Sequence, residues 1–478
     1  MNILLIHPKL NYAPSPRFPL GLGYIASALR DEGHSIEVID LNAQAELENC
    51  LGERIKTGNF DLVGLTAMIT QFRDVERLSS LIKKSSGSKI VIGGGLASAI
   101  PEMLLKETKT DIVVMGEGEK TIVEIAERIA HGQSIQNISG IAYRKGERVM
   151  KNPLRGYIDD ISSLSFPAWD LFPVEHYFNN NVMCMPKRRI SIITSRGCPY
   201  QCTFCFHGIF GHRYRARTAG NVFQEIELLY QKYKVRGFVI EDDTFILDKN
   251  RVYKLCDLII KNKLRIYWSC NARVDLVDEE FIRKIKSAGC VEIAYGIESG
   301  NQGQLDKIKK GVTLDQAYKT IKLTKKAGIL THGFVMLNTP GETVETINDS
   351  INFCKKAGLQ AEFTILTPIP GSTIYAEAVK ANIISEKKLV ENWGSWLDKV
   401  LSNFSTLSDE ALIGMKRRAE SEIFRSIYKR NMKDIFLMFF LEFKINGFLC
   451  LLKRVKRGLR VAVRAHRGLG LKESPQTS

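Results

Sequence analysis

The segment Arg196-Gly197-Cys198-Pro199-Tyr200-Gln201-Cys202-Thr203-Phe204-Cys205 holds three of the ten cysteines of this 478-residue chain. Its spacing is C-x3-C-x2-C, and it follows an apolar run, residues 190–194, that predicts a β-strand. Three thiolates on one tight loop can each bind a corner iron of a cubane, and a cluster with three rather than four cysteines keeps one iron open. Zinc is the competing metal, but the nearest further ligand, His207, is poorly spaced for tetrahedral closure. We therefore predict a 4Fe–4S cluster bound by Cys198, Cys202 and Cys205.

Strands and helices alternate on the C-terminal side of this segment, which predicts a barrel. Helical patterns such as 222–232, 251–261 and 314–327 separate the strands. Six β/α units within roughly 200 residues predict a partial (β/α)6 TIM barrel over residues 188–400, with its chemistry on the loops after the strands. The six predicted strands are Ile190–Thr194, Gly237–Glu241, Arg265–Cys270, Val291–Gly296, Leu330–Leu337 and Ala361–Leu366.

Residues 1–140 show a second β/α alternation and predict a doubly wound, flavodoxin- or Rossmann-like α/β domain. Apolar strands separated by amphipathic helices favour a parallel sheet covered on both faces, which binds ligands at the carboxyl ends of its strands. Residues 141–187, with a hairpin around Lys145-Gly146-Glu147 and then scattered prolines, predict a connector. Residues 401–478 predict a helical, basic extension. The predicted strands of the first domain are Ile3–His7, Ile36–Asp40, Leu62–Thr66, Lys89–Gly93 and Ile112–Gly116.

Composition indicates a cytoplasmic protein. The cysteines outside the cluster segment are scattered, which does not suit a disulfide framework and fits a reducing compartment. The N-terminus lacks a basic segment and a cleavage site, so no signal peptide is predicted. No run of 18 or more uncharged apolar residues predicts a transmembrane helix.

The net charge of +16 is concentrated partly in the tail, where residues 453–478 contain eight Lys or Arg and one Glu. Lys453, Arg457, Arg460, Arg464 and Arg467 fall on one helical face, opposite apolar side chains. A basic amphipathic helix is typical of contact with the inner face of a membrane, which would suit a lipophilic substrate. A solvated tail and a helix packed on the barrel are the alternatives. Nucleic acid is not expected, because no aromatic residues interleave with the basic ones.

The cysteine segment resembles the signature of the radical S-adenosylmethionine superfamily, including the aromatic Phe204 before the last cysteine. The resemblance covers roughly residues 187–380 and implies that a 4Fe–4S cluster cleaves S-adenosylmethionine reductively to a 5′-deoxyadenosyl radical. An external one-electron donor of the flavodoxin or ferredoxin type is implied as well. The further matching motifs are Glu241-Asp242-Asp243-Thr244-Phe245, Cys270-Asn271-Ala272-Arg273, Gly296-Ile297-Glu298-Ser299-Gly300, Lys310-Gly311, Pro340-Gly341-Glu342-Thr343 and Pro368-Ile369-Pro370-Gly371.

The resemblance also implies which residues face S-adenosylmethionine. Asp242 and Asp243 would contact its amino group or line the substrate edge, and a structural ion pair is the alternative role for each acid. One position departs from the family pattern: Asn338 stands where relatives usually have glycine, and its side chain would narrow the cavity. The predicted S-adenosylmethionine contacts are Phe204, Asp242, Asp243, Asn271, Arg273 and Glu298.

Gly64-Leu65-Thr66-Ala67-Met68 ends the third predicted strand, and Gly93-Gly94-Gly95 and Gly116-Glu117-Gly118-Glu119 follow the next two. With Pro19-Leu20-Gly21-Leu22-Gly23-Tyr24 at the start of the first helix, the N-terminal domain resembles the cobalamin-binding domain that precedes many radical S-adenosylmethionine barrels. Small residues after its strands would let the nucleotide tail of cobalamin approach the backbone. The Asp-x-His-x-x-Gly motif of many corrinoid enzymes is absent, and His7 is interpreted as a packed or capping residue, so cobalt without a histidine lower ligand is predicted. A domain that has lost its cofactor and only caps the barrel is the alternative. The predicted cobalamin contacts are Gly21, Thr66, Ala67, Met68, Gly93, Gly94, Gly116, Glu117 and Gly118.

These observations favour a cobalamin-dependent radical enzyme acting on an unactivated carbon of a small or lipophilic molecule, by C-methylation or by cyclisation or rearrangement. RNA methylthiolation is excluded, because only Cys50 and Cys184 precede Cys198 where a second cluster would need three cysteines. The remaining alternatives are a cobalamin-free radical enzyme and a corrinoid-binding sensor or carrier without catalysis.

Overall fold

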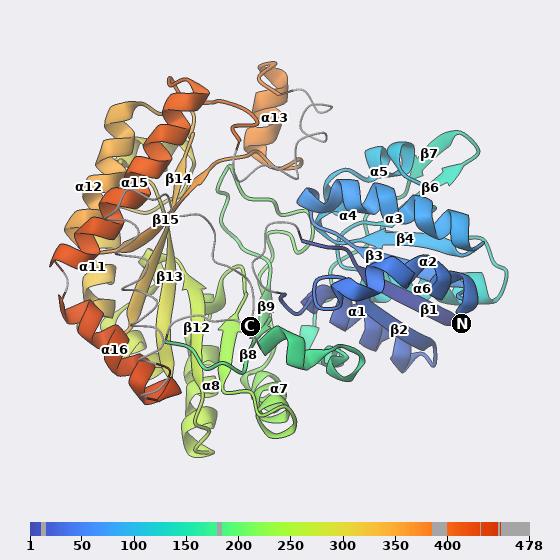
Figure 1. Cartoon of the computed structure of the whole chain (residues 1–478), viewed down its shortest axis with the longest axis horizontal. Helices are drawn as coiled ribbons and strands as arrows, with labels where there is room; N and C mark the ends of the chain where they lie inside the picture. The colour runs from blue at the N-terminus through green and yellow to red at the C-terminus, as the bar shows by residue number, and fades with distance from the viewer. Residues whose placement is uncertain (11–15, 179–183, 385–398, 431, 448–449, 451–478) are drawn as a thin grey trace.

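The computed structural model describes residues 1–10, 16–178, 184–384, 399–430, 432–447 and 450 (Figure 1). The chain forms two α/β units that lie side by side. Five strands of the first sheet are parallel to one another. Their order is β2 (Ser35–Asp40), β1 (Asn2–His7), β3 (Leu62–Thr66), β4 (Lys89–Gly93) and β5 (Ile112–Val114).

Both faces of this sheet are covered because its central strands are apolar at nearly every position. Ile3 and Leu5 of β1 point to one face, where α1 (Leu20–Asp31) and α6 (Glu119–Ala130) cover them. Leu4 and Ile6 point to the other face. There the sheet is covered by α2 (Leu51–Thr57), α3 (Phe72–Ser85), α4 (Gly95–Ala99) and α5 (Pro101–Glu107). The predicted doubly wound arrangement is confirmed.

A hairpin makes the first sheet mixed rather than purely parallel. The strands β6 (Ile141–Lys145) and β7 (Arg148–Lys151) add to β5 in antiparallel register, with Gly146 at φ +63° in the turn. The sequence predicts this hairpin but places it in the connector. Pairing with β6 covers the edge of β5, which would otherwise expose a row of unpaired backbone groups. The division of the chain at residues 140 and 187 stays a prediction.

The second unit contains the predicted six-stranded parallel sheet. Its order is β15 (Gln360–Ile365), β14 (Leu330–Leu337), β13 (Cys290–Glu298), β12 (Tyr267–Ala272), β11 (Gly237–Ile240) and β8 (Arg189–Ile192). The order follows the sequence, as a partial barrel requires, with β8 and β15 at the two edges. No strand end differs from its predicted position by more than two residues. The main outer helices are α7 (Ala219–Lys232), α8 (Lys249–Lys261), α9 (Glu279–Ser287), α11 (Leu314–Lys326) and α12 (Val344–Ala357).

The segment between the two units joins them through a shared apolar core. Phe18, directly before α1, packs against three aromatic rings of this segment, with ring centroids 4.0 Å from Trp169, 4.7 Å from Phe172 and 5.6 Å from Tyr177. The same core continues into the helices of the barrel. The orientation of the two units is therefore fixed by packing rather than left to a linker.

The C-terminal part is helical, as predicted. Helix α13 (Thr373–Lys380) faces the first unit, α15 (Asp409–Arg430) packs against α12 and β15, and α16 (Met432–Asn446) follows. The predicted basic helix at residues 453–467 lies outside the described residues. Among the described helices, none has the length and apolar character needed to span a bilayer.

Candidate cofactor-binding sites

The cluster segment is anchored by two aspartates at the end of β11. The Asp242 carboxylate accepts hydrogen bonds from the Thr194 backbone N–H and hydroxyl, both at 2.5 Å, and from the Ser195 hydroxyl at 2.6 Å. Asp243 accepts a 3.1 Å hydrogen bond from the Gly197 backbone N–H. Burial raises the pKa of Asp243 above its ordinary value, and the neighbouring Asp242 charge adds to this effect. Both acids thus hold the backbone directly before Cys198 through hydrogen bonds, and Asp242 also lies 3.8 Å from Arg251, an ion pair of the kind given above as the alternative role.

A left-handed turn at Gly197 starts the cluster loop. Its φ is +83°, and a Cβ built there would lie 2.3 Å from the Arg213 carbonyl oxygen. That contact is far inside van der Waals distance, so only glycine fits. The return segment pairs with the loop through the short strands β9 (Ser195–Arg196) and β10 (Arg215–Ala216). The chain is therefore folded back tightly where the first cysteine leaves the strand.

The surroundings favour the thiolate form at one of the three predicted cluster ligands, Cys202. Cys202 has a pKa lowered to about 6, first by a hydrogen bond from the Cys205 thiol and then by the cations Lys310 and Arg273. The pKa of Cys205 is raised, because the Cys205 thiol donates this hydrogen bond to Cys202 and because it is buried. The Thr244 hydroxyl donates to Cys198 Sγ at 3.1 Å. Thiolates bind iron, so this donor set fits the predicted cluster.

A single-ion arrangement is not present in the described part of the chain. No group of three or more His, Cys, Asp or Glu side chains there is close enough to hold one metal ion. A tetrahedral zinc site needs its ligands within about 2.3 Å of one point, whereas a cubane spreads three ligands over three corners.

Charged groups of opposite sign lie beside the cluster loop, at the carboxyl ends of β12 and β13. Lys310 Nζ donates to the Glu298 carboxylate at 2.7 Å, and both side chains are buried. Burial favours the neutral amine, but the Glu298 charge, the hydrogen bond to Glu298 and the nearby Cys202 together outweigh burial and raise the pKa of Lys310. The Arg273 guanidinium stacks 3.6 Å from the ring centroid of Tyr200 and donates to the Lys310 carbonyl at 2.9 Å. An amino acid headgroup would meet both a carboxylate and cations here.

The remaining predicted S-adenosylmethionine contacts lie around the same edge. The Phe204 ring centroid is 6.0 Å from Lys310 Nζ, and Asn271 is exposed at the end of β12. Asn338, the departure from the family pattern, is fully buried. Its side-chain amide donates to the carbonyls of Leu366 and Ser402 at 3.0 and 2.7 Å, so it ties β14 to the C-terminal segment. It does not project into an open site, and the expected narrowing is therefore not seen.

All nine predicted cobalamin contacts line one cavity of about 340 Å³ at the carboxyl ends of the first sheet. The opposite wall belongs to the cluster side of the second unit and consists of Ile193, Arg196, Ile209 and Phe210. The cavity therefore borders both units. It ends against the same segment that continues into the cluster cysteines.

Glycines on the wall of this cavity leave the backbone exposed to it without side chains. Where a Cβ would stand on Gly21 or Gly93, no atom lies within 4 Å, so both backbones border open space. Gly94 is different, because its φ is +91° and an added Cβ would lie 2.9 Å from the Ala67 carbonyl oxygen, so this position requires glycine. A flat ligand with a long tail can approach such a wall closely, which fits cobalamin.

His7 lies on this wall at the end of β1. Its Nδ1 is 2.9 Å from Asp40 Oδ1, and Tyr177 donates to the other Asp40 oxygen at 2.7 Å. Burial opposes ionisation of Asp40, but the hydrogen bond and charge of His7, with the hydrogen bonds from Tyr177 and Asn42, together outweigh burial and lower the Asp40 pKa. His7 is thus packed in a buried polar network, in agreement with its interpretation from the sequence.

A buried ion network joins the two units at the edge of the cavity. Arg215 donates to both oxygens of Glu117 at 2.8 Å, and Arg196 donates to Glu117 at 2.8 Å and to Glu119 at 2.6 Å. All four side chains are at most 7% exposed. The Glu117 carboxylate also accepts the Ile158 backbone N–H at 2.8 Å. Its oxygens are therefore engaged by the protein, although the residue lines the cavity.

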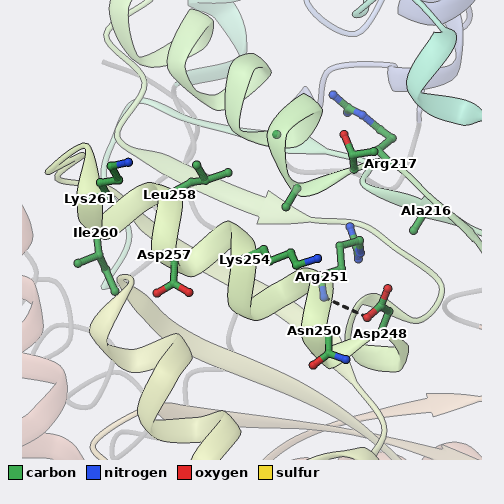
Figure 2. A pocket seen from close by; sticks show the side chains of 13 residues that line it. Ala216, Arg217, Asp248, Asn250, Arg251, Lys254, Asp257, Leu258, Ile260 and Lys261 are labelled. Atoms are coloured by element: carbon green, nitrogen blue, oxygen red, sulfur yellow. Dashed lines mark hydrogen bonds between the residues drawn. The ribbon is translucent and has the colours of Figure 1, made fainter.

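A wider groove of about 940 Å³ lies outside the barrel between α7 and α8 (Figure 2). It is lined by charged side chains of both signs, including Arg217, Arg251, Lys254, Asp248 and Asp257. None of the predicted cofactor contacts lines it, so we assign it no cofactor.

Several residues of these sites are not predicted as such by the sequence. Tyr200 and Arg196 lie within the quoted cysteine segment, and Lys310 within a quoted motif, but neither pattern shows what each side chain contacts. Arg215 carries no sequence signal, because its partner Glu117 is 98 residues away.

The fold and these sites define an iron–sulfur enzyme of the radical S-adenosylmethionine class. Residues 192–354 match the Radical SAM superfamily, and residues 10–126 match the B12 binding domain. An uncharacterized methyltransferase of Pyrococcus horikoshii is 31% identical over 355 residues, which cover 73% of this chain and 76% of that protein. The chain belongs to the family of B12-binding radical S-adenosylmethionine enzymes.

Two further relatives show the breadth of this family. The anaerobic magnesium-protoporphyrin IX monomethyl ester cyclase of Rubrivivax gelatinosus is 27% identical over 365 residues, which cover 73% of this chain and 65% of that protein. The radical S-adenosylmethionine methyltransferase TsrM from Kitasatospora setae, solved with cobalamin and a 4Fe–4S cluster bound, matches with a TM-score of 0.69. It is 22% identical, with 80% of this chain and 75% of that chain covered, so the likeness concerns the fold. Family membership confirms the predicted set of cofactors, whereas the residue assignments stay predictions.

Proposed function

We propose that this enzyme transfers a methyl group to an unactivated carbon of a small or lipophilic metabolite. When bound, the cofactors supply a 5′-deoxyadenosyl radical to abstract hydrogen and a cobalt-bound methyl group to replace it. The chain's own residues bind and orient: Cys198, Cys202 and Cys205 hold the cluster, while Glu298 and Arg273 receive the headgroup of S-adenosylmethionine. The buried ion network, which joins the two units, fixes the position of one cofactor site relative to the other.

One observation carries this proposal. The cavity that contains all nine predicted cobalamin contacts is closed on its far side by residues that run into the cluster loop. A substrate held at this edge would face both cofactors at once. A domain that merely capped the barrel would not need small residues on its side of the cavity, and Gly21 and Gly93 both face open space.

Cyclisation or rearrangement is the second candidate, because one relative is named a cyclase and matches this chain over 365 residues. A ring closure would use the radical without transferring the methyl group. The fold does not decide between the two candidates, because the same barrel supports both reactions. Identification of the substrate would decide between them.

The proposal is tested by anaerobic reconstitution with hydroxocobalamin, iron, sulfide and a flavodoxin- or ferredoxin-type reductant. We expect about four irons and one cobalt per chain, by analogy with a cubane and one corrinoid. Given S-adenosylmethionine with a deuterated methyl group and a cell extract, the enzyme should form 5′-deoxyadenosine and a product that carries the deuterated methyl group. Iron without cobalt would overturn the cobalamin-dependent part. Deoxyadenosine with an unlabelled product would favour cyclisation or rearrangement.

A further inference from the structure

Helix α16 exposes a stripe of phenylalanines at the surface. Phe436, Phe440 and Phe443 are 73%, 52% and 52% exposed and follow one another at spacings of four and three residues. This spacing places them on one helical face. Phe436 is the most exposed large apolar side chain among the described residues. Water contact with three such rings in one row is costly, so the stripe indicates a contact surface.

The opposite face of α16 is firmly packed on the barrel. Leu441 is buried, and the fully buried Glu442 accepts the Cys184 backbone N–H at 2.8 Å. Asn446 donates to the Met185 carbonyl at 3.1 Å. The helix is therefore held in place by its own polar contacts, and the exposed rings do not result from a detached helix.

The charge of the sequence that follows α16 indicates which partner the phenylalanine stripe contacts. In the sequence from Lys444 to Lys472 there are nine Lys or Arg and no Asp or Glu. Exposed aromatic rings that are followed in the sequence by such a run of cations complement an anionic lipid surface, where rings enter the acyl boundary and cations meet the headgroups. Each cation near such a surface strengthens the attraction. We propose that the exposed face of α16 binds anionic membrane lipid, with Phe436, Phe440 and Phe443 inserted.

The place of α16 in the fold decides what this contact does. Cys184 and Met185 precede β8, and Leu437 lies beside Gly328, which precedes β14. Helix α16 thus lies at the amino ends of the barrel strands, while the cluster cysteines follow the carboxyl end of β8 (Figure 1). The membrane contact and the cofactors are at opposite ends of the barrel. The contact anchors the enzyme and does not deliver lipid to the cluster.

The proposal is tested by flotation of the full-length protein with vesicles of phosphatidylglycerol and phosphatidylethanolamine, or of phosphatidylcholine alone. The triple variant F436S/F440S/F443S is compared with L154S/L228S/I260S, which removes three exposed apolar side chains elsewhere. We expect the wild type and the control variant to float with anionic vesicles. The triple variant should lose at least tenfold in the bound fraction, and neutral vesicles should bind little.

Three outcomes would overturn the proposal. The first is flotation of the triple variant at the wild-type level, and the second is a wild type that binds neither vesicle. The third is a contact between two copies of the chain, shown by a wild-type dimer that the triple substitution dissociates without any vesicle binding. Iron content and S-adenosylmethionine cleavage serve as the folding control. Both should be unchanged in the triple variant, because α16 is remote from the cluster.

Discussion

Arg215 Nη1 donates to both carboxylate oxygens of Glu117, each at 2.8 Å, across the boundary between the cobalamin-binding unit and the barrel. Arg215 comes from β10, which is paired with the start of the cluster loop, and Glu117 comes from the loop that lines the cavity of the predicted cobalamin contacts. One guanidinium nitrogen, Nη1, bridges the two oxygens, while Nη2 donates to the Phe210 carbonyl at 3.0 Å, so both ends of the Arg215 guanidinium are held. This pair therefore sets how the cavity faces the cluster, and the network with Arg196 and Glu119 extends it.

Glu117→Gln should destabilise the protein by about 3 to 5 kcal/mol, because it leaves buried arginines without a full counter-charge. Urea unfolding followed by circular dichroism measures this loss. Arg213→Gln is the matched control, since its pair with Asp159 is 65% and 71% exposed and should cost less than about 1 kcal/mol. Equal effects of the two changes would show that the buried network does not hold the units together.

Gly197→Ala should abolish cluster binding. The added Cβ would lie 2.3 Å from the Arg213 carbonyl oxygen at a φ of +83°, so the loop must move before Cys198 can reach its position. Iron per chain after anaerobic reconstitution is the measurement, and it should fall from about four to near zero. Gly87→Ala, where a Cβ meets no atom within 4 Å, should keep its iron. A fully loaded Gly197→Ala protein would disprove the role of this turn.

The architecture can be predicted from sequence because its signals are local. Apolar runs such as Leu330–Leu337 specify strands within a few residues, and the cysteine spacing marks the loop after β8. The sequence predicts the hairpin β6–β7 but not its pairing with β5, because an edge strand is completed by whichever segment reaches it. Likewise, Asp242 looks available for a ligand, whereas three donors from Thr194 and Ser195 occupy it. Hydrogen bonds between residues that are distant in the sequence leave no periodic pattern in it, so they cannot be predicted from the sequence.

Glu342 predicts a pH dependence of stability. Burial raises its pKa to about 7, and the backbone N–H groups of Thr339 and Asn338 only partly offset this. The folded state thus binds the proton more tightly than the unfolded state, whose pKa is near 4.5. The extra proton contributes to the free energy of unfolding below pH 4.5. This contribution, at most about 3 kcal/mol, is lost as the pH rises through about 7.

Glu342→Gln mimics the protonated form and should flatten this slope, so that the variant gains stability over the wild type as the pH is raised from about 5 to about 8. Urea unfolding at several pH values within this range gives the comparison. Glu345→Gln, a nearby exposed acid, should leave the wild-type slope unchanged. Parallel curves for the wild type and Glu342→Gln would mean that Glu342 does not carry the extra proton.

Gly93→Val should block cobalamin while sparing the cluster. Gly93 ends β4 on the cavity wall, and nothing lies within 4 Å of the position of its Cβ, so a side chain at this position starts in open cavity space. Valine is also favoured in strands, and stability should change by less than about 1 kcal/mol. Cobalt per chain should fall at least tenfold, with iron and reductive cleavage of S-adenosylmethionine retained. The same change at Gly87, which does not line the cavity, should keep both metals. Cobalt retained in Gly93→Val would place the corrinoid elsewhere, and loss of both metals would point to misfolding rather than to a filled site.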